Sequence, residues 1–159
     1  MTSTVSKLAE PRLVNVEAKS VAGLSETYRQ NEMSRIGEQW HLFGPRIGKI
    51  PGQKSNVAYG VVFGKPGGIE YITGVEVSAT ADAGEDLKRI TVPAGKYAVF
   101  PHKGTVSTLA KSIDAIYHDW LPASGHKLAD NPKFIERYGE KFDPGTGSGD
   151  IEIWVPLKT

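Results

Sequence analysis

The sequence predicts an α+β fold in which an antiparallel sheet is backed by helices on one side. Three observations support this prediction. The order strand, helix, strand, turn, strand occurs twice along the chain, each half contains one amphipathic helix, and glycine-rich turns separate neighbouring strands. Because one helix covers only one face of such a sheet, we expect the two halves to pack together around a shared groove.

The first half covers about residues 10–80, after a small and polar tail at residues 1–9. It opens with a predicted strand at 11–24 that is broken near Lys19, and a helix follows that Pro45 ends. The helix is predicted by apolar residues at three- and four-residue steps: Met33, Ile36, Trp40 and Phe43. A hairpin completes this half, with strands at 56–63 and 69–77 and a turn at 64–68.

The second half covers about residues 88–158 and repeats this order with little sequence identity. A strand at 96–104 leads into the clearest helix of the chain, which we expect Pro122 to close. The apolar stripe of this helix consists of Val106, Leu109, Ala110, Ile113, Tyr117, Trp120 and Leu121. The remaining elements are a strand at 132–139, a glycine-rich loop at 143–150 and a last strand at 151–157.

Composition excludes several classes of function. The 159 residues suit one domain with a core, and we place it at 10–158. The 19 basic and 18 acidic residues give no electrostatic basis for binding nucleic acid or an anionic membrane. No run of about 18 apolar residues and no signal-peptide segment occurs, so we expect a cytoplasmic protein. The chain has no cysteine, which excludes disulfides, thiolate catalysis and cysteine metal sites.

Short motifs do not point to a cofactor or a metal. The closely spaced glycines of 145–149 precede a strand rather than a helix, so we expect a flexible loop and no phosphate site. Four histidines lack metal-ligand spacing: His41, His102, His118 and His126. No GxSxG elbow nominates a catalytic serine. We therefore expect no cofactor and no metal, and we place His118 and Asp119 on the solvated face of the second helix.

The last strand carries an acid in an unusual position. Strand alternation puts Ile151, Ile153, Val155 and Leu157 on one face, and Asp150, Glu152, Trp154 and Pro156 on the other. One interpretation of Glu152 is a charge in water or in an ion pair with a nearby Lys or Arg. The other is a carboxylate at the bottom of an aromatic cavity, where it would hold a proton or wait for a cation. Alternation alone leaves both interpretations open.

Aromatic and glycine residues on the strands suggest walls for such a cavity. Gly60 and Gly74 lie inside predicted strands, where glycine often marks the close approach of another group. An aromatic box with one acid attracts flat, apolar cations, and a poised carboxyl also serves as a general acid or base. The predicted ligand-binding residues are Glu152, Trp154, Tyr71, Tyr138, Tyr59, Phe63, Phe100 and Gly74.

Four segments in this order resemble a known family: "YITGVEV" (71–77), "AVFPHKG" (98–104), "YHDWLPASGHKL" (117–128) and "DIEIWVPL" (150–157). With the duplicated layout, they resemble the GyrI-like small-molecule-binding domain, the effector-binding module of AraC- and MerR-type multidrug-sensing regulators. The resemblance implies a pseudo-twofold module with a ligand cleft between its halves. It further implies a lipophilic cation held by aromatics and a buried glutamate of the last strand, a position that Glu152 matches.

The resemblance leaves three functions open. The first is a small-molecule-binding protein for apolar, cationic compounds, with Glu152 as counter-charge. The second is a hydrolase of reactive cyclopropane-containing compounds, in which Glu152 would activate water and Tyr71 or Tyr138 would assist. The third is an interaction protein that inhibits a target such as gyrase. About ten residues precede the first strand, too few for a helix-turn-helix, so we expect no direct DNA binding.

Overall fold

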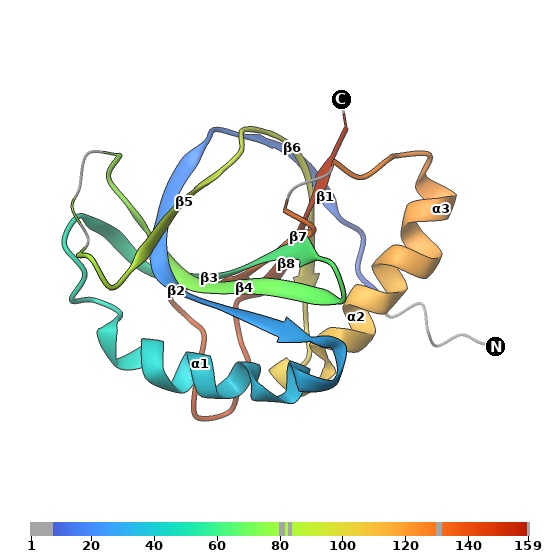
Figure 1. Ribbon diagram of the computed structural model, residues 1–159. Coiled ribbons are helices and arrows are strands. Elements are labelled where there is room, and N and C mark those ends of the chain that lie inside the picture. The colour runs from blue at the N-terminus through green and yellow to red at the C-terminus, as the bar shows by residue number, and fades with distance from the viewer. Residues whose placement is uncertain (1–7, 80–81, 83, 130–131, 159) are drawn as a thin grey trace.

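The fold is a single curled antiparallel sheet with helical segments on its outer side, as Figure 1 shows. It is seen in a computed structural model that describes residues 8–79, 82, 84–129 and 132–158. The eight strands lie in the order β1-β6-β8-β7-β3-β4-β2-β5. Their bounds are β1 Arg12–Val16, β2 Lys19–Arg29, β3 Gln53–Lys65, β4 Gly68–Val77, β5 Lys88–Val92, β6 Gly95–His102, β7 Phe134–Tyr138 and β8 Ile151–Leu157. The predicted α+β class is confirmed.

The two ends of the sheet belong to one continuous pair of bent strands. Val16 of β1 lies opposite Gly95 of β6, and Lys19 of β2 lies opposite Val92 of β5. The register does not change across the bend, so residues 12–16 and 19–23 pair in one continuous register with residues 95–99 and 88–92. Since β1 and β5 stand at opposite ends of the strand order, this pairing brings the sheet round on itself.

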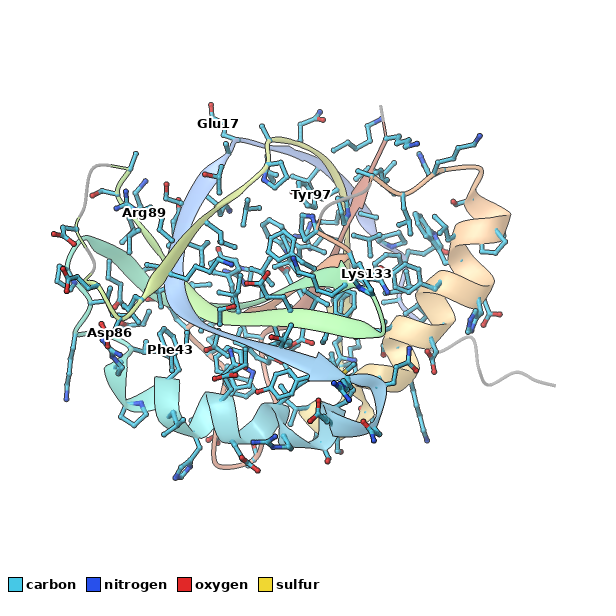
Figure 2. All side chains as sticks on the ribbon, viewed as in Figure 1. Glu17, Phe43, Asp86, Arg89, Tyr97 and Lys133 are labelled. Carbon is cyan, nitrogen blue, oxygen red and sulfur yellow. The ribbon has the colours of Figure 1, made fainter. Side chains whose placement is uncertain are left out.

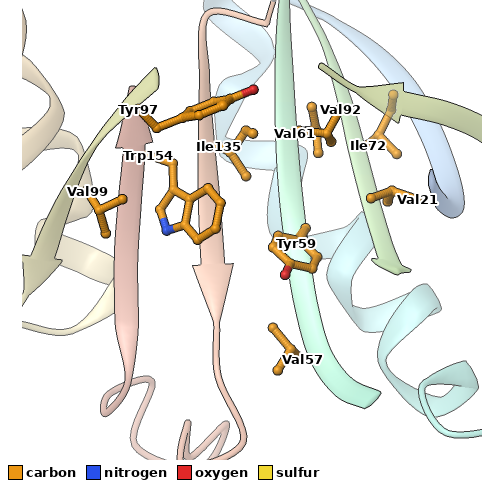
Figure 3. Close-up of a cluster of buried hydrophobic side chains, with 10 residues drawn as sticks. All are labelled: Val21, Val57, Tyr59, Val61, Ile72, Val92, Tyr97, Val99, Ile135 and Trp154. Atoms are coloured by element: carbon orange, nitrogen blue, oxygen red, sulfur yellow. The ribbon is translucent and has the colours of Figure 1, made fainter. Parts of the chain in front are cut away.

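The inside of the curl is filled by apolar side chains (Figure 3). The buried members of this inner cluster are Val21, Val57, Tyr59, Val61, Ile72, Val92, Tyr97, Val99, Ile135 and Trp154. They come from seven of the eight strands, all except β1, so the cluster connects nearly the whole sheet. Burial of this kind is the main favourable term in folding.

Two helical segments cover the outer face of the sheet (Figure 1). The first comprises η2 Gln30–Arg35, α1 Ile36–Phe43 and η3 Gly44–Arg46; the second comprises η4 Val106–Thr108, α2 Leu109–Ala115, the π-helical turn η5 Ile116–Trp120 and α3 Leu121–Ser124. Pro122 does not end the second segment, contrary to prediction, but lies in α3 directly after the π-helical turn. Gly125, with φ of 79°, ends it in the left-handed conformation.

The strand predictions differ from the structure mainly in extent. The strand predicted at 11–24 is two strands that meet at residues 17–18, and the second one continues to Arg29. The first helix therefore starts later as an α-helix, at Ile36, after a 3-10 segment. The strand β5 was not predicted as a separate element, because five residues with one buried position give little periodic signal.

The alternation predicted for the last strand is confirmed. Ile151, Ile153, Val155 and Leu157 pack beneath the second helical segment, whereas Trp154 points into the inner cluster. Within the described parts of the chain, no helix is long and apolar enough to cross a membrane.

Candidate functional site

The carboxylate of Glu152 is engaged by arginine side chains on the inner face of the sheet. Its Oε2 lies 3.2 Å from Nη2 of Arg12, and its Oε1 lies 3.6 Å from Nη1 of Arg137. Oε1 also accepts a hydrogen bond of 3.0 Å from the indole Nε1 of Trp154. Of the two sequence interpretations, this geometry is that of the ion-paired charge. The predicted ligand role of Glu152 stays a prediction, without an unpaired carboxylate to support it.

The aromatic rings beside Glu152 already hold a cation of the protein itself. The Lys19 Nζ lies 4.9 Å from the ring centre of Trp154 and 5.5 Å from that of Tyr59. Burial lowers the pKa of Lys19, and nearby Glu76 partly opposes this shift. A cationic ligand at these rings would have to compete with Lys19.

The structure does not bring the eight predicted ligand-binding residues together. Five lie on the inner face of the sheet: Glu152, Trp154, Tyr59, Phe63 and Gly74. Three lie on the outer face, under the helical segments: Tyr71, Tyr138 and Phe100. The separation follows from strand parity, which the sequence left undetermined for 56–63 and 69–77.

A second carboxylate, Glu136 on β7, lies on that outer face and is buried, with 7% exposure. Its Oε1 accepts hydrogen bonds from the phenol groups of Tyr71, at 2.5 Å, and Tyr138, at 2.8 Å. Among the residues that the structure describes, Glu136 forms no ion pair, and its Oε2 has no hydrogen-bond donor. This is the arrangement that the sequence predicted for Glu152: a buried carboxylate among aromatic rings without a counter-charge.

Burial dominates the electrostatics of this group. It raises the pKa of Glu136 above its ordinary value, although the two phenol hydrogen bonds favour the ionised form and oppose the shift. Burial and the neighbouring carboxylate also raise the pKa values of Tyr71 and Tyr138, so both phenols stay protonated. The site therefore contains two neutral O–H donors and a carboxyl group whose charged form is disfavoured by burial.

Gly60 on β3 makes room for the contact between Tyr71 and Glu136. It pairs with Glu136 on one side and with Thr73 of β4 on the other. A Cβ at this position would clash with the Tyr71 hydroxyl and would lie 2.9 Å from Glu136 Oε1. The sequence marked Gly60 and Gly74 as sites of close approach. Gly60 borders the carboxylate, whereas a Cβ at Gly74 would meet Val21 and the backbone of Ala22.

Trp40 of α1 packs against both phenols that bond to Glu136. Its indole Nε1 donates a hydrogen bond of 3.0 Å to the Tyr71 hydroxyl. Its ring stands edge-on to Tyr138, with centroids 5.2 Å apart, and to Tyr71, at 6.5 Å. The sequence predicted Trp40 as a core residue of the first helix, and the structure adds this contact with the polar group.

The neighbour of Trp40 fixes α1 to the sheet. The buried Gln39 donates from Nε2 to the backbone carbonyls of Leu24 and Tyr71, each at 2.9 Å. Its Oε1 accepts a hydrogen bond of 2.8 Å from the Tyr28 hydroxyl. Because Gln39 bonds to both β2 and β4, the backbone next to Trp40 is held against these two strands.

The sequence contains the signal for Glu136, and sequence reasoning missed it. In "PKFIERYG" the residues Phe134, Glu136 and Tyr138 alternate on one face, an acid between two aromatics. "DIEIWVPL" carries a related pattern, in which Glu152 lies beside one aromatic residue, Trp154. In the structure the two acids differ in face, burial and partners, and Arg12 and Arg137 lie beside Glu152 alone.

No metal site accompanies these residues in the part of the chain that is described: no three His, Asp or Glu side chains gather there as a ligand set. The carboxyl group and the phenols of the Glu136 site instead suit hydrogen bonding and charge recognition of an organic ligand.

Comparisons with known proteins agree with a ligand-binding fold. The chain is 33% identical to the transcriptional regulator BrlR of Pseudomonas aeruginosa, over 97% of this chain and 60% of that protein. It is 32% identical to a DNA gyrase inhibitor of Erwinia billingiae, over 56% of this chain and 57% of that protein. The chain thus spans about 60% of the length of these relatives.

Among solved structures, SAV2435 bound to tetraphenylphosphonium matches with a TM-score of 0.73 and 20% identity, over 94% of both chains. At this identity the likeness concerns the fold. The sequence model of the GyrI-like small molecule binding domain matches residues 9–158, nearly the whole chain. The chain therefore belongs to the GyrI-like small-molecule-binding domain family.

Proposed function

We propose that this domain binds an apolar, cationic small molecule on the outer face of the sheet, with Glu136 as its counter-charge. One observation carries the proposal: Glu136 is a buried carboxylate without a cationic partner among the described residues, held by two phenols beneath an indole. An isolated buried carboxylate is costly in its charged form. A bound cation would remove that cost, because it lets the carboxyl group ionise in contact with a positive charge.

The aromatic groups around Glu136 favour the same class of ligand. Tyr71, Tyr138 and Trp40 present ring faces and edges that attract cations and pack against flat apolar groups. The structural neighbour SAV2435 binds tetraphenylphosphonium, which is a lipophilic cation. Glu152 is the weaker candidate, since Arg12 and Arg137 already neutralise it.

Two probes of the same shape and opposite charge test the proposal. Tetraphenylphosphonium and tetraphenylborate carry the same four phenyl groups, so titration calorimetry with both separates the charge contribution from the apolar one. We expect the phosphonium to bind more tightly, and Glu136→Gln to weaken it at least tenfold, about 1.4 kcal/mol. Equal loss of both probes in Glu136→Gln would reject the counter-charge role.

A hydrolase that uses the same residues is the second candidate. It is supported by the raised pKa of Glu136 and by a phenol hydrogen-bonded to that carboxyl group. In the reaction, water would add to one carbon of a strained cyclopropane and the ring C–C bond would break. Glu136 would take the proton from water, and a phenol would give a proton to the released carbon.

Turnover separates the two candidates. Glu136→Gln should abolish product formation from a cyclopropane-containing electrophile while a neutral product analogue still binds. A wild-type protein that binds such compounds and never consumes them is a binding protein.

A further inference from the structure

We infer that the indole of Trp40 occupies the position of the ligand above Glu136, and that a ligand enters when this side chain rotates away. The inference rests on the proposed function of Glu136 and adds how the site is closed and which ligands replace the indole. Three independent features carry it: the packing of Trp40, its hydrogen bond and the empty space on its own helix.

Trp40 packs on top of the site and does not form one of its buried sides. The described residues form four buried apolar clusters, and Trp40 packs against three of them. Its ring reaches Phe43 of its own helix, Tyr71 of β4 and Tyr138 of β7. Yet Trp40 is only half-buried, whereas Tyr71, Tyr138 and Glu136 beneath it are buried. The indole is therefore the outermost group of the site.

The hydrogen bond of Trp40 identifies what can replace it. The indole N–H donates to the Tyr71 hydroxyl, which donates in turn to Glu136 Oε1. A planar aromatic group with one N–H donor thus already completes the hydrogen bonding of Tyr71. A planar aromatic cation that carries an N–H offers the same stacking surface and the same donor, and it adds the positive charge that indole lacks. This is the ligand class that the geometry assigns.

The helix leaves space for the indole to rotate without moving itself. Positions three before and four after Trp40 lie on the same helix face, and both are glycine: Gly37 and Gly44. A Cβ at either glycine would meet no heavy atom within 4 Å. Helical side chains lean toward the preceding turn, so the space at Gly37 lies in the path of the outward rotation. Gln39 meanwhile keeps the backbone fixed through its bonds to β2 and β4.

The experiment measures affinity and association rate for tetraphenylphosphonium and proflavine, a planar cation with N–H donors. The variants are Trp40→Leu, Gly37→Leu, Glu136→Gln and, as a control, Trp120→Phe, whose ring packs on Phe100 and His126. If one tenth of the molecules have the indole displaced, Trp40→Leu raises affinity about tenfold. Gly37→Leu should slow the association of both cations at least threefold without lowering the melting temperature. Trp120→Phe should change neither the affinity nor the association rate.

A second readout follows the indole directly. The chain has three tryptophans, so a Trp120→Phe, Trp154→Phe protein has Trp40 as its only indole. Its emission should shift to longer wavelength when proflavine or tetraphenylphosphonium binds, because the indole moves into water. An unshifted spectrum at saturation contradicts the displacement.

The outcomes separate the two proposals. If wild type binds the cations in a Glu136-dependent way, but Trp40→Leu binds them equally or more weakly, the displacement is wrong and the proposed function stands. If neither wild type nor Trp40→Leu binds either cation, both are wrong. Tighter binding by Trp40→Leu that Glu136→Gln abolishes supports both.

Discussion

The hydroxyl of Tyr71 on β4 lies 2.5 Å from the carboxylate of Glu136 on β7, although strand β3 runs between them. The contact is possible because β3 presents Gly60 at the crossing point, directly opposite Glu136. Three adjacent strands thus contribute one residue each: a donor, an acceptor and a gap. The side chains of a sheet rarely meet across an intervening strand, and here the missing Cβ permits it. Figure 2 shows side chains, Phe43 among them, between α1 and the sheet.

Gly60→Ala should therefore destabilise the fold and disrupt the site. The added Cβ would clash with the Tyr71 hydroxyl and crowd Glu136, and overpacking of this kind typically costs about 1–3 kcal/mol. Gly64→Ala on the same strand is the matched control, because its Cβ would meet only the flexible Lys133 side chain, at 3.2 Å. Urea unfolding of both variants measures the difference; equal stability would show that Tyr71 and Glu136 do not need the gap.

The buried carboxyl group should make stability depend on pH in a defined direction. The pKa of Glu136 is raised in the folded protein, so the folded state keeps its proton at a pH where the unfolded state has lost it. The stability that this bound proton contributes is fully present below the ordinary pKa of 4.5. It is lost as the pH rises through the pKa that Glu136 has in the folded protein. Stability should fall in that window by up to about 1.4 kcal/mol per pH unit. In Glu136→Gln the free energy of unfolding should depend less on pH in this window than in wild type. An unchanged slope in the variant would show that other groups cause the pH dependence.

The two phenols should differ in their importance. Tyr71→Phe removes a donor to Glu136 and also leaves the Trp40 N–H without its acceptor, so we expect a loss of about 2 kcal/mol. Tyr138→Phe removes only one donor and should cost about 1 kcal/mol. Each substitution should raise the pKa of Glu136 further, since each removes a hydrogen bond that favours the ionised form. Thermal unfolding at several pH values measures both effects. A larger loss of stability in Tyr138→Phe than in Tyr71→Phe would contradict the role of the hydrogen bond from Trp40 to Tyr71.

The two acidic residues can be compared in one binding experiment. Glu152→Gln disturbs ion pairs with Arg12 and Arg137 at the edge of the inner face, which should cost less than about 1 kcal/mol of stability. We expect it to leave the affinity for tetraphenylphosphonium within twofold of wild type, in contrast to Glu136→Gln. A larger loss in Glu152→Gln than in Glu136→Gln would restore the original assignment of Glu152.

Much of the fold could be predicted from the sequence because its signals are local. Apolar residues at helical spacing predicted both helical segments, and alternation in 151–157 placed the four aliphatic residues beneath a helix. The 3-10 and π-helical turns could not be predicted, because the same apolar spacing fits them and an α-helix. Pro122 similarly looked like a stop, since its position in a helix depends on the turn that precedes it.

The site could be predicted only as a pattern, an acid beside strand aromatics. Choosing between Glu136 and Glu152 requires the pairing of β1 with β6 and of β7 with β8, which brings Arg12 and Arg137 to Glu152. The β1–β6 pairing joins residues 79 to 87 positions apart, such as Val16 with Gly95 and Arg12 with Val99, and no local rule specifies it. The parity of β4 likewise decides whether Tyr71 or Ile72 faces the helices.

The continuous register across the bend also makes the two repeats exchange their leading strands. The first strand of the first repeat, β1, pairs with β6 of the second repeat. In the same way, the first strand of the second repeat, β5, pairs with β2 of the first repeat. Each repeat therefore depends on a strand of the other repeat to complete its part of the sheet. Such an exchange resembles a domain swap sealed within one chain. It implies that neither repeat completes its part of the sheet without the other, so the two halves should unfold together in one transition.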